Sequence, residues 1–531
     1  MLAARVLARD RGVVASESWV RLAFISAARM AARICAVPVG ALLGIYVGTF
    51  VAPALLVVRG EWVKRIALFV LSPFFGLYFG VSLGFSYLSK GKVDKTLLVA
   101  KAFHKYAPIF TLPKALTHQG LGLVVVTRHR DVRDVLARDD VFRVDLYDER
   151  MRAAAGAFFL GMDASADDPG KSHPSGCSTP PGVPQRLEAA PTGDYDRERA
   201  LGAAALGRDE AHMKESVGRM AQALVNGALG RPTRTLDVVS EFAHAVQLNL
   251  IKEYFGISDT SDERLLGWLE TMSFFIFNFW VGGPYRTLAV RAGSELSEHL
   301  HELVRERVAE MAHDRPIVDD VVGRMVLRLQ AASQGQPIDE ALAVRCLAGL
   351  ISGATVPTIG TLVQVVDRLL DLPAPLRNEL KKASLTQNDA VVRRFVREAA
   401  RFSAYPPTLY RHAASAHLLC PGTDREKSVE QGAWVVMLPI LANFDESIFP
   451  NPEVFDPYRN ETEETAPLLF GWARHRCLGE HMAELVIVEM VKRLFSRDVE
   501  RAPGSAGRIQ KGEAGKIPDG DYARRLIVHL E

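Results

Sequence analysis

Residues 469–480 read LFGWARHRCLGE, and this stretch decides how the 531-residue chain is interpreted. Cys477 follows a loop rich in glycine, arginine and histidine, and the apolar pattern after it predicts a helix over residues 478–495. A sulfur at a helix N-terminus is stabilised as an anion by the helix dipole and by backbone N–H donors, and the Arg-His-Arg run at 474–476 adds positive charge. We therefore expect an anionic sulfur suited to bind haem iron, with a buried structural cysteine as the alternative.

The order of residues at 470–479, FGWARHRCLG, resembles the haem-binding signature of the cytochrome P450 superfamily, Phe-Gly-x-Gly-x-[His/Arg]-x-Cys-x-Gly. Ala473 stands where the family usually has a glycine, and alanine restricts the backbone of this loop. The resemblance implies that Cys477 is the axial ligand of haem b (iron protoporphyrin IX). It also implies that Phe470 packs beside the haem and that His475 reaches a propionate.

Two further segments resemble the family's structural motifs in the expected order. Glu398 and Arg401 form a Glu-x-x-Arg motif, whose spacing places both side chains on one face of a helix. Taken alone, such a pair is usually an ordinary surface ion pair. Residues 455–459, FDPYR, supply the family's third partner as Arg459. The resemblance implies that these three residues lock the fold on the proximal side of the haem and take no part in the chemistry.

Other residues match the family's contacts to the haem propionates. Residues 405–411 read YPPTLYR, and the resemblance implies that Arg411, at the start of a strand lining the substrate pocket, binds a propionate. Tyr195 and Arg199 occupy the family's Trp/His-x-x-x-Arg positions, and their i, i+4 spacing points both toward one surface. A solvated helix face is the alternative for Arg199.

The soluble part of the chain has mainly helical periodicity. Helical patterns dominate from 195 to 372, short β-rich runs occur at 122–127 and 409–441, and the resemblance covers about residues 93–525. We therefore expect a mainly α fold with a minor β part, the cytochrome P450 fold, over residues 93–531. Residues 163–194 contain six prolines and four glycines and predict a flexible surface insertion.

A long apolar helix is predicted from residue 338 to about 371, opened by Pro337 and Asp339. In the family the corresponding helix crosses the haem and carries an acid and a threonine that deliver protons during oxygen activation. Here residues 352–358 read SGATVPT, so Thr355 takes the acid position and no carboxylate is present. Thr355 or Thr358 is then the candidate for proton delivery through water, and Pro357 should kink the helix.

The N-terminal part predicts a membrane anchor. Residues 34–58 and 66–89 carry no charge, and each is long enough to span a bilayer as a helix. Residues 1–33 form a basic flank with six arginines, and lysines follow the second stretch. Both outer flanks are then expected on the cytoplasmic side, which places the catalytic domain in the cytoplasm. A re-entrant hairpin is an alternative form of this anchor, and a buried soluble hairpin is the alternative to membrane insertion.

Composition narrows the partners and the cofactors. The net charge of +2 argues against a nucleic-acid binder, and five scattered cysteines argue against a disulfide framework, a zinc ribbon or an iron–sulfur cluster. No flavin or ferredoxin signature is present. A ferredoxin with its reductase, or a flavoprotein reductase, must then bring electrons, with Arg474 and Arg476 as candidate docking contacts. The aromatic segment 274–280, FFIFNFW, lies where the family has its substrate-access region, although core packing explains most of its rings.

The resemblance favours a membrane-anchored haem-thiolate monooxygenase that oxidises an apolar, lipid-like substrate with O₂. The missing acid keeps a second hypothesis open, in which the haem enzyme rearranges or uses peroxides without electrons, as an isomerase, dehydratase or peroxygenase. A third hypothesis is a haem-binding sensor without enzymatic activity.

Overall fold

The computed structural model describes residues 104, 109–112, 122–156, 158, 195–207, 209–279, 281–313, 315–403, 405–511 and 522–531. The predicted membrane segments at 34–58 and 66–89 and the predicted insertion at 163–194 lie outside these residues. The chain divides into two compact units, 1–106 and 107–531, and every element described below belongs to the second unit.

Helices make up most of this unit. The longer ones are α9 (Tyr195–Leu206), α10 (Glu210–Leu229), α11 (His244–Glu253), α12 (Asp262–Phe277), α13 (Pro284–Ala312), α14 (Val321–Ala332), α15 (Glu340–Leu370), α16 (Ala374–Leu385), α17 (Asp389–Phe402) and α19 (Glu480–Leu494). Three shorter helices are α6 (His129–Ala137), α7 (Asp148–Ala154) and α18 (Pro439–Ala442). Polar residues cap several of these helices, as the sequence predicts for α15, where the Leu342 N–H donates to the Asp339 carboxylate at 2.9 Å.

The strands form one larger sheet and three small ones. The five-stranded sheet has the order β1 (Ile109–Leu112), β2 (Leu123–Val126), β8 (Trp434–Met437), β5 (Leu409–Ala413) and β3 (Phe142–Arg143). In this sheet β2 and β8 are parallel and the other pairs are antiparallel. A three-stranded sheet has the order β4 (Thr235–Asp237), β12 (Ile527–Leu530) and β9 (Val499–Arg501). Two two-stranded sheets pair β6 (His417–Leu419) with β7 (Lys427–Val429), and β10 (Gln510–Lys511) with β11 (Ala523–Arg525). The expectation of a mainly helical fold with a minor β part is confirmed.

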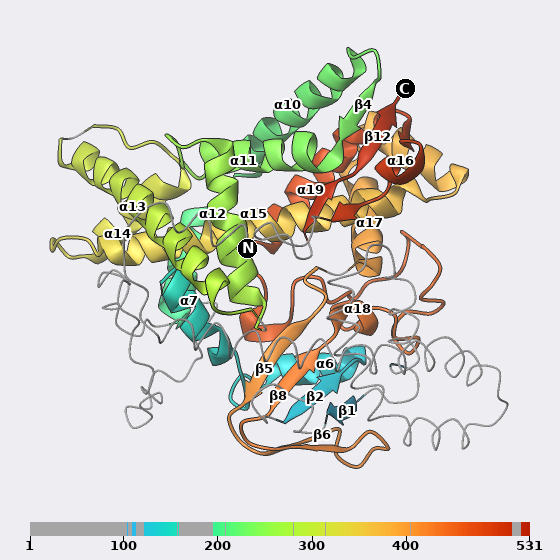
Figure 1. Cartoon of the computed structure of the whole chain (residues 1–531), viewed down its shortest axis with the longest axis horizontal. Helices are drawn as coiled ribbons and strands as arrows, with labels where there is room; N and C mark the ends of the chain where they lie inside the picture. The colour runs from blue at the N-terminus through green and yellow to red at the C-terminus, as the bar shows by residue number, and fades with distance from the viewer. Residues whose placement is uncertain are drawn as a thin grey trace, which may run out of the picture. The chain divides into compact units, whose positions relative to one another are not determined.

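The elements separate into two regions of this unit (Figure 1). Helices α10, α11 and α19 gather near β4 and β12, whereas β1, β2, β5 and β8 lie together beside α6 and α18 at the other end. Valines of β2 and β8 alternate toward a cluster that α6 completes with Val132, Val135 and Leu136. The sheet is therefore held by its own apolar core, separate from the helices above it.

Helix α15 is the central helix of the unit. It packs against α13, α17, α12, α11 and α19, and its observed bounds differ by at most two residues from the range predicted from its apolar pattern. Among the described residues, it is the one helix whose length and hydropathy would also suit a membrane span, and 67% of that window is buried inside the protein. Its apolar side chains therefore serve the core.

Candidate functional site

Cys477 lies at the end of a compact turn that precedes α19. We call residues 470–479 the cysteine loop. The Cys477 N–H donates to the Phe470 carbonyl at 2.8 Å, and the Arg476 N–H donates to the Ala473 carbonyl at 3.0 Å. These two hydrogen bonds fold the loop back on itself and bring the start of the signature next to the cysteine.

Ala473, the one departure from the family signature, has a backbone conformation that favours glycine. Its φ is 55°, in the left-handed region that glycine adopts freely and that costs other residues about 1–2 kcal/mol. The loop therefore keeps the conformation that the family's glycine allows, and alanine adopts it under strain. The sequence predicted a restriction at this position, and the structure shows Ala473 in a backbone conformation that favours glycine.

The thiol of Cys477 is accessible at the surface of the loop, although protein atoms surround it closely enough to remove much of its solvation. This desolvation raises the pKa of the thiol above its ordinary value. The Gly479 N–H and the positive charges of Arg199 and Arg476 lower the pKa, but they do not outweigh burial. The prediction that these surroundings alone keep the sulfur anionic is therefore wrong. Coordination to a metal ion would supply the missing stabilisation.

Two residues of α9 point at the cysteine loop. The Tyr195 hydroxyl donates to the Arg474 carbonyl at 2.7 Å, and Arg199 Nη2 donates to the Arg476 carbonyl at 2.7 Å. His475 is buried, and its ring meets the Tyr195 ring edge-on with the centroids 4.9 Å apart. The structure thus brings together Tyr195, Arg199, His475 and Cys477, which the sequence placed in one site from separate motifs.

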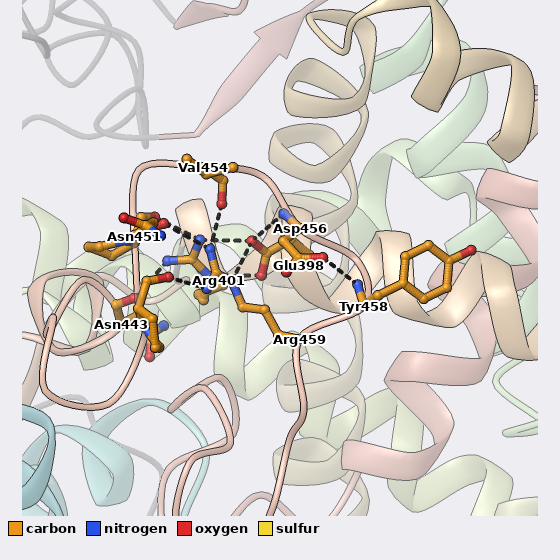
Figure 2. A network of polar contacts seen from close by, with 10 residues as sticks. Glu398, Arg401, Asn443, Asn451, Val454, Asp456, Tyr458 and Arg459 are labelled. Carbon is orange, nitrogen blue, oxygen red and sulfur yellow. Dashed lines mark hydrogen bonds and ion pairs between the residues drawn. The ribbon is translucent and has the colours of Figure 1, made fainter.

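Glu398, Arg401 and Arg459 form one buried network (Figure 2). Arg401 donates from Nε and Nη2 to the two carboxylate oxygens of Glu398, both at 2.8 Å, and Arg459 Nε donates to Glu398 Oε1 at 3.1 Å. Arg401 has no exposed surface. Its remaining donors reach the carbonyls of Asn443 and Pro452 at 2.8 Å each. The guanidinium therefore ties α17 to the chain segment that leads toward the cysteine loop.

Asn443 extends this network and was not singled out by the sequence. It is fully buried, and its Oδ1 accepts a hydrogen bond from the Leu468 N–H at 2.8 Å, just before the cysteine loop. A continuous path of hydrogen bonds therefore runs from Glu398 through Arg401 and Asn443 to the loop. The only sequence signal was that Asn443 opens the segment NFDESIFPNP, which resembles the family's approach to the FxPxR motif.

The middle of α15 borders open space on one side. Gly353 is exposed, whereas Ser352 and Ala354 beside it are buried. A Cβ added at Gly353 would meet no atom within 4 Å. The helix continues through Pro357, which has no N–H to give to the Gly353 carbonyl one turn earlier. The Gly353 face is therefore where a bound group could lie against α15.

Thr355 and Thr358 do not share this open face. At about 100° per residue, they lie about 160° and about 140° around the helix from Gly353. Both are buried, and the Thr355 hydroxyl donates to the Ile351 carbonyl at 2.7 Å. The structure therefore does not bring the two predicted proton-delivering hydroxyls to the side of α15 that is open.

Comparisons with known proteins agree with these features. The cytochrome P450 family model matches residues 235–497. The structure superposes on that of P450BioI in complex with an acyl carrier protein carrying hexadec-9Z-enoic acid, with a TM-score of 0.60, 19% identity and coverage of 81% of this chain and 97% of that one. A mutant of P450 EryK bound to erythromycin B gives a TM-score of 0.60, 20% identity and coverage of 83% and 98%. The chain belongs to the cytochrome P450 superfamily.

The matches between this chain and its curated relatives span different shares of the relatives' lengths. Cytochrome P450 107B1 of Saccharopolyspora erythraea is 23% identical over 424 residues, which is 77% of this chain and 92% of the relative. Cytochrome P450 55A3 of Fusarium lichenicola is 25% identical over 285 residues, and the match spans 62% of its length, less than two thirds. Haem is the cofactor of the cytochrome P450 family, to which this chain belongs.

The residues present fit a haem. Cys477 is exposed at the end of the cysteine loop, and a thiolate there can coordinate iron. The open face at Gly353 leaves room for a flat group against α15, the helix that crosses the haem in this family. Arg411, predicted to bind a propionate, is buried on β5, and its Nη1 donates to the Tyr410 carbonyl at 2.8 Å.

Aromatic residues gather near Arg411 and were only partly anticipated. The Phe279 ring lies against the rings of Tyr147, Tyr410 and Trp434, with centroids 4.9, 5.1 and 5.0 Å away. We call these four residues the aromatic cluster. It joins the segment after α12 to β5 and β8. Phe274 and Phe275 are buried, in line with the core packing expected for them, and Trp280 lies outside the described residues.

Arg150 holds the segment that follows α12, and nothing in the sequence marked it. Its guanidinium donates to the carbonyls of Phe275, Asn278, Phe279 and Val281 at 2.5–3.1 Å. A cation among carbonyls at the C-terminal end of a helix also interacts favourably with the helix dipole. Arg150 therefore fixes the position of Phe279 in the aromatic cluster.

Proposed function

We propose that the protein is a membrane-anchored cytochrome P450 monooxygenase that oxidises an apolar, lipid-like substrate with electrons from a separate protein. The observation that carries the haem-thiolate part of this proposal is the exposed thiol of Cys477 at the end of the hydrogen-bonded cysteine loop. The absence of a carboxylate at residues 352–358 of α15 bears on whether the oxidant is O₂ or a peroxide. The aromatic cluster bears on the class of substrate.

Each residue of the site has a proposed task. Cys477 is the axial thiolate, Phe470 packs beside the haem, and His475 and Arg411 pair with propionates. Glu398, Arg401 and Arg459 keep the cysteine loop in place through the hydrogen-bond path that includes Asn443. When bound, the haem would supply the oxidising chemistry.

An apolar substrate is favoured by the aromatic cluster, because rings supply large apolar area near the proposed haem-binding Arg411. The fold itself does not decide the substrate. One structure of similar fold was solved with a fatty acyl chain on a carrier protein and another with erythromycin B. We favour the lipid-like class because it also fits an enzyme held at a membrane.

A second candidate function is supported by α15. Residues 352–358 contain no carboxylate, and the Thr355 hydroxyl is already bonded to the Ile351 carbonyl. Moreover, a bifunctional dioxygenase–epoxy alcohol synthase of Pyricularia oryzae is 30% identical over 129 residues, 24% of this chain. The alternative is therefore an enzyme that uses or rearranges lipid hydroperoxides and needs no electrons.

One experiment with two arms distinguishes the monooxygenase from the hydroperoxide-using enzyme. The purified full chain in detergent is given either a fatty acid with NAD(P)H and surrogate redox partners, or a fatty-acid hydroperoxide without reductant. We expect oxygenated product in the first arm, and hydroperoxide turnover at least about tenfold slower in the second. Turnover in the hydroperoxide arm alone would establish the alternative. A reduced, CO-bound spectrum without the red-shifted Soret band of thiolate ligation would exclude both.

The redox partner is proposed to be a ferredoxin with its reductase, or a flavoprotein reductase. Arg474 and Arg476 were the candidate docking contacts, but both are paired within the chain. Arg476 donates to both carboxylate oxygens of Glu480 at 2.6 and 2.8 Å, and Arg474 Nη2 donates to Asp196 at 2.7 Å. An acidic partner would therefore have to compete with these carboxylates, so we expect Arg474 and Arg476 to add little to its affinity.

The membrane anchor is proposed from the charge-free stretches 34–58 and 66–89. The compact unit 107–531 contains every element of the proposed haem site, which supports an anchor that is separate from it. We expect the full chain to stay with membranes after an alkaline carbonate wash. A chain of residues 93–531 should appear in the soluble fraction with unchanged haem content. An insoluble, haem-free shorter chain would mean that the apolar stretches belong to the fold.

A further inference from the structure

Helix α9 reaches the cysteine loop at two points one helical turn apart. The Tyr195 hydroxyl and Arg199 Nη2 donate to the carbonyls of Arg474 and Arg476, each at 2.7 Å. Residues four apart lie on one face of a helix, so both bonds come from the same side. Their acceptors flank His475, and the second acceptor belongs to the residue directly before Cys477.

Three more contacts connect the same two elements. Arg474 Nη2 donates to Asp196 at 2.7 Å, and the Arg474 guanidinium lies over the Tyr195 ring, 4.8 Å from its centroid. The His475 ring meets the Tyr195 ring edge-on. The loop is thus held from both its backbone and its side chains by the first turns of α9. We call these contacts the α9 clamp.

The clamp also places a fixed charge beside the sulfur. Arg199 and Arg476 are the cations that act most on Cys477. Arg476 is balanced by Glu480, to which it donates two hydrogen bonds. Arg199 is the cation of α9 that acts on the sulfur, at a place fixed by its bond to the loop.

We propose that Tyr195 and Arg199 are positioning residues that act through the cysteine loop on the bond between the Cys477 sulfur and the haem iron. The expectation from the sequence was only that they bind a propionate. The proposal rests on Cys477 being the axial ligand, as proposed above. Tyr195 fixes the path of the loop, and Arg199 both fixes it and draws electron density on the sulfur away from the iron.

The test compares full-length Tyr195→Phe and Arg199→Gln with Arg197→Gln, which removes the same charge from an exposed position on the same helix. Resonance Raman spectroscopy of the ferric protein, with the same fatty acid added as in the activity experiment above, measures the Fe–S stretch. The half-life of the thiolate-ligated CO complex is measured alongside.

We expect the Fe–S band to shift in Tyr195→Phe and Arg199→Gln. The half-life should fall by about tenfold in Arg199→Gln, as for the loss of one charge-assisted hydrogen bond. Arg197→Gln should match the wild type in both measurements.

The outcomes are separable. Should Arg199→Gln bind too little haem to measure, Tyr195→Phe decides, because it removes a single hydroxyl and leaves the ring in place. An unchanged Fe–S band in the measurable variants would overturn the proposal. So would faster haem loss in Arg199→Gln with an unchanged Fe–S band, which would leave Arg199 a propionate contact only. If the wild type itself gives no thiolate band, the proposed function fails, and the clamp fails with it.

Discussion

Arg401→Ala is expected to abolish folded, haem-containing protein. The substitution removes five hydrogen-bond donors from a site with no exposed surface and leaves the Glu398 carboxylate, itself 3% exposed, without its bidentate partner. Removing one member of a buried ion pair costs about 3–5 kcal/mol, a large share of the roughly 5–15 kcal/mol that stabilises a typical domain. Arg459 still reaches Glu398, but through a single nitrogen at 3.1 Å.

The comparison for Arg401→Ala is Arg393→Ala on the same helix. Arg393 is 43% exposed, and its nearest carboxylate, that of Glu484, is 3.5 Å away. The Glu484 side chain is 15% exposed and also pairs with Arg397, so we expect this long, partly exposed pair to contribute about 1 kcal/mol or less. The measurements are the yield of soluble protein, its haem content and the thermal unfolding midpoint. If Arg401→Ala retained haem and unfolded within a few degrees of Arg393→Ala, the network in Figure 2 would not hold the fold together.

Arg401 also shows which part of the site a sequence can predict. The pairing of Glu398 with Arg401 follows from helix periodicity alone, because i, i+3 residues share a face. The carbonyls of Asn443 and Pro452 that receive the other donors lie far along the chain. They are brought in by tertiary packing and leave no pattern at the spacing of a motif. The role of Arg401 as a link to the cysteine loop therefore required the structure.

The same division holds for the fold. The bounds of α15 were predicted within two residues, because a long apolar stretch with Asp339 as its N-cap leaves little choice. The sequence did not predict which face of α15 would stay uncovered. The motif alignment drew attention to Thr355, whereas burial shows that Gly353 carries the open face. Alignment gives order along the chain, and only the packing of neighbouring helices determines which face stays uncovered.

Electrostatic predictions failed where they depended on burial. The sequence placed Cys477 correctly at the N-terminal end of a helix and next to arginines. It could not supply the desolvation that raises the pKa of the thiol, because burial is set by tertiary packing and not by the local sequence. For the same reason Arg199 was expected to face a propionate, and its bond to the Arg476 carbonyl was not foreseen.

Cys477→Ala is expected to leave the fold intact and remove the haem chemistry. The Cys477 side chain is exposed, so its truncation should change the free energy of unfolding by less than about 1 kcal/mol. Without the sulfur the iron loses its proposed axial ligand. The reduced, CO-bound protein should then lack the red-shifted Soret band, and monooxygenase activity should fall by about three orders of magnitude or more.

Cys420→Ala is the matched control for Cys477→Ala, because it removes another thiol that is not fully buried. The Cys420 thiol donates to Asp131 of α6 at 3.1 Å, and Cys420 is not a proposed haem ligand. Its loss should leave the spectrum and the activity unchanged and cost about 1 kcal/mol of stability for one hydrogen bond. A red-shifted band that survived in Cys477→Ala would mean that another residue ligates the iron, and the cysteine loop would then need a different function. A band lost in both variants would point to general damage to the haem site, because Cys420 is not the proposed ligand.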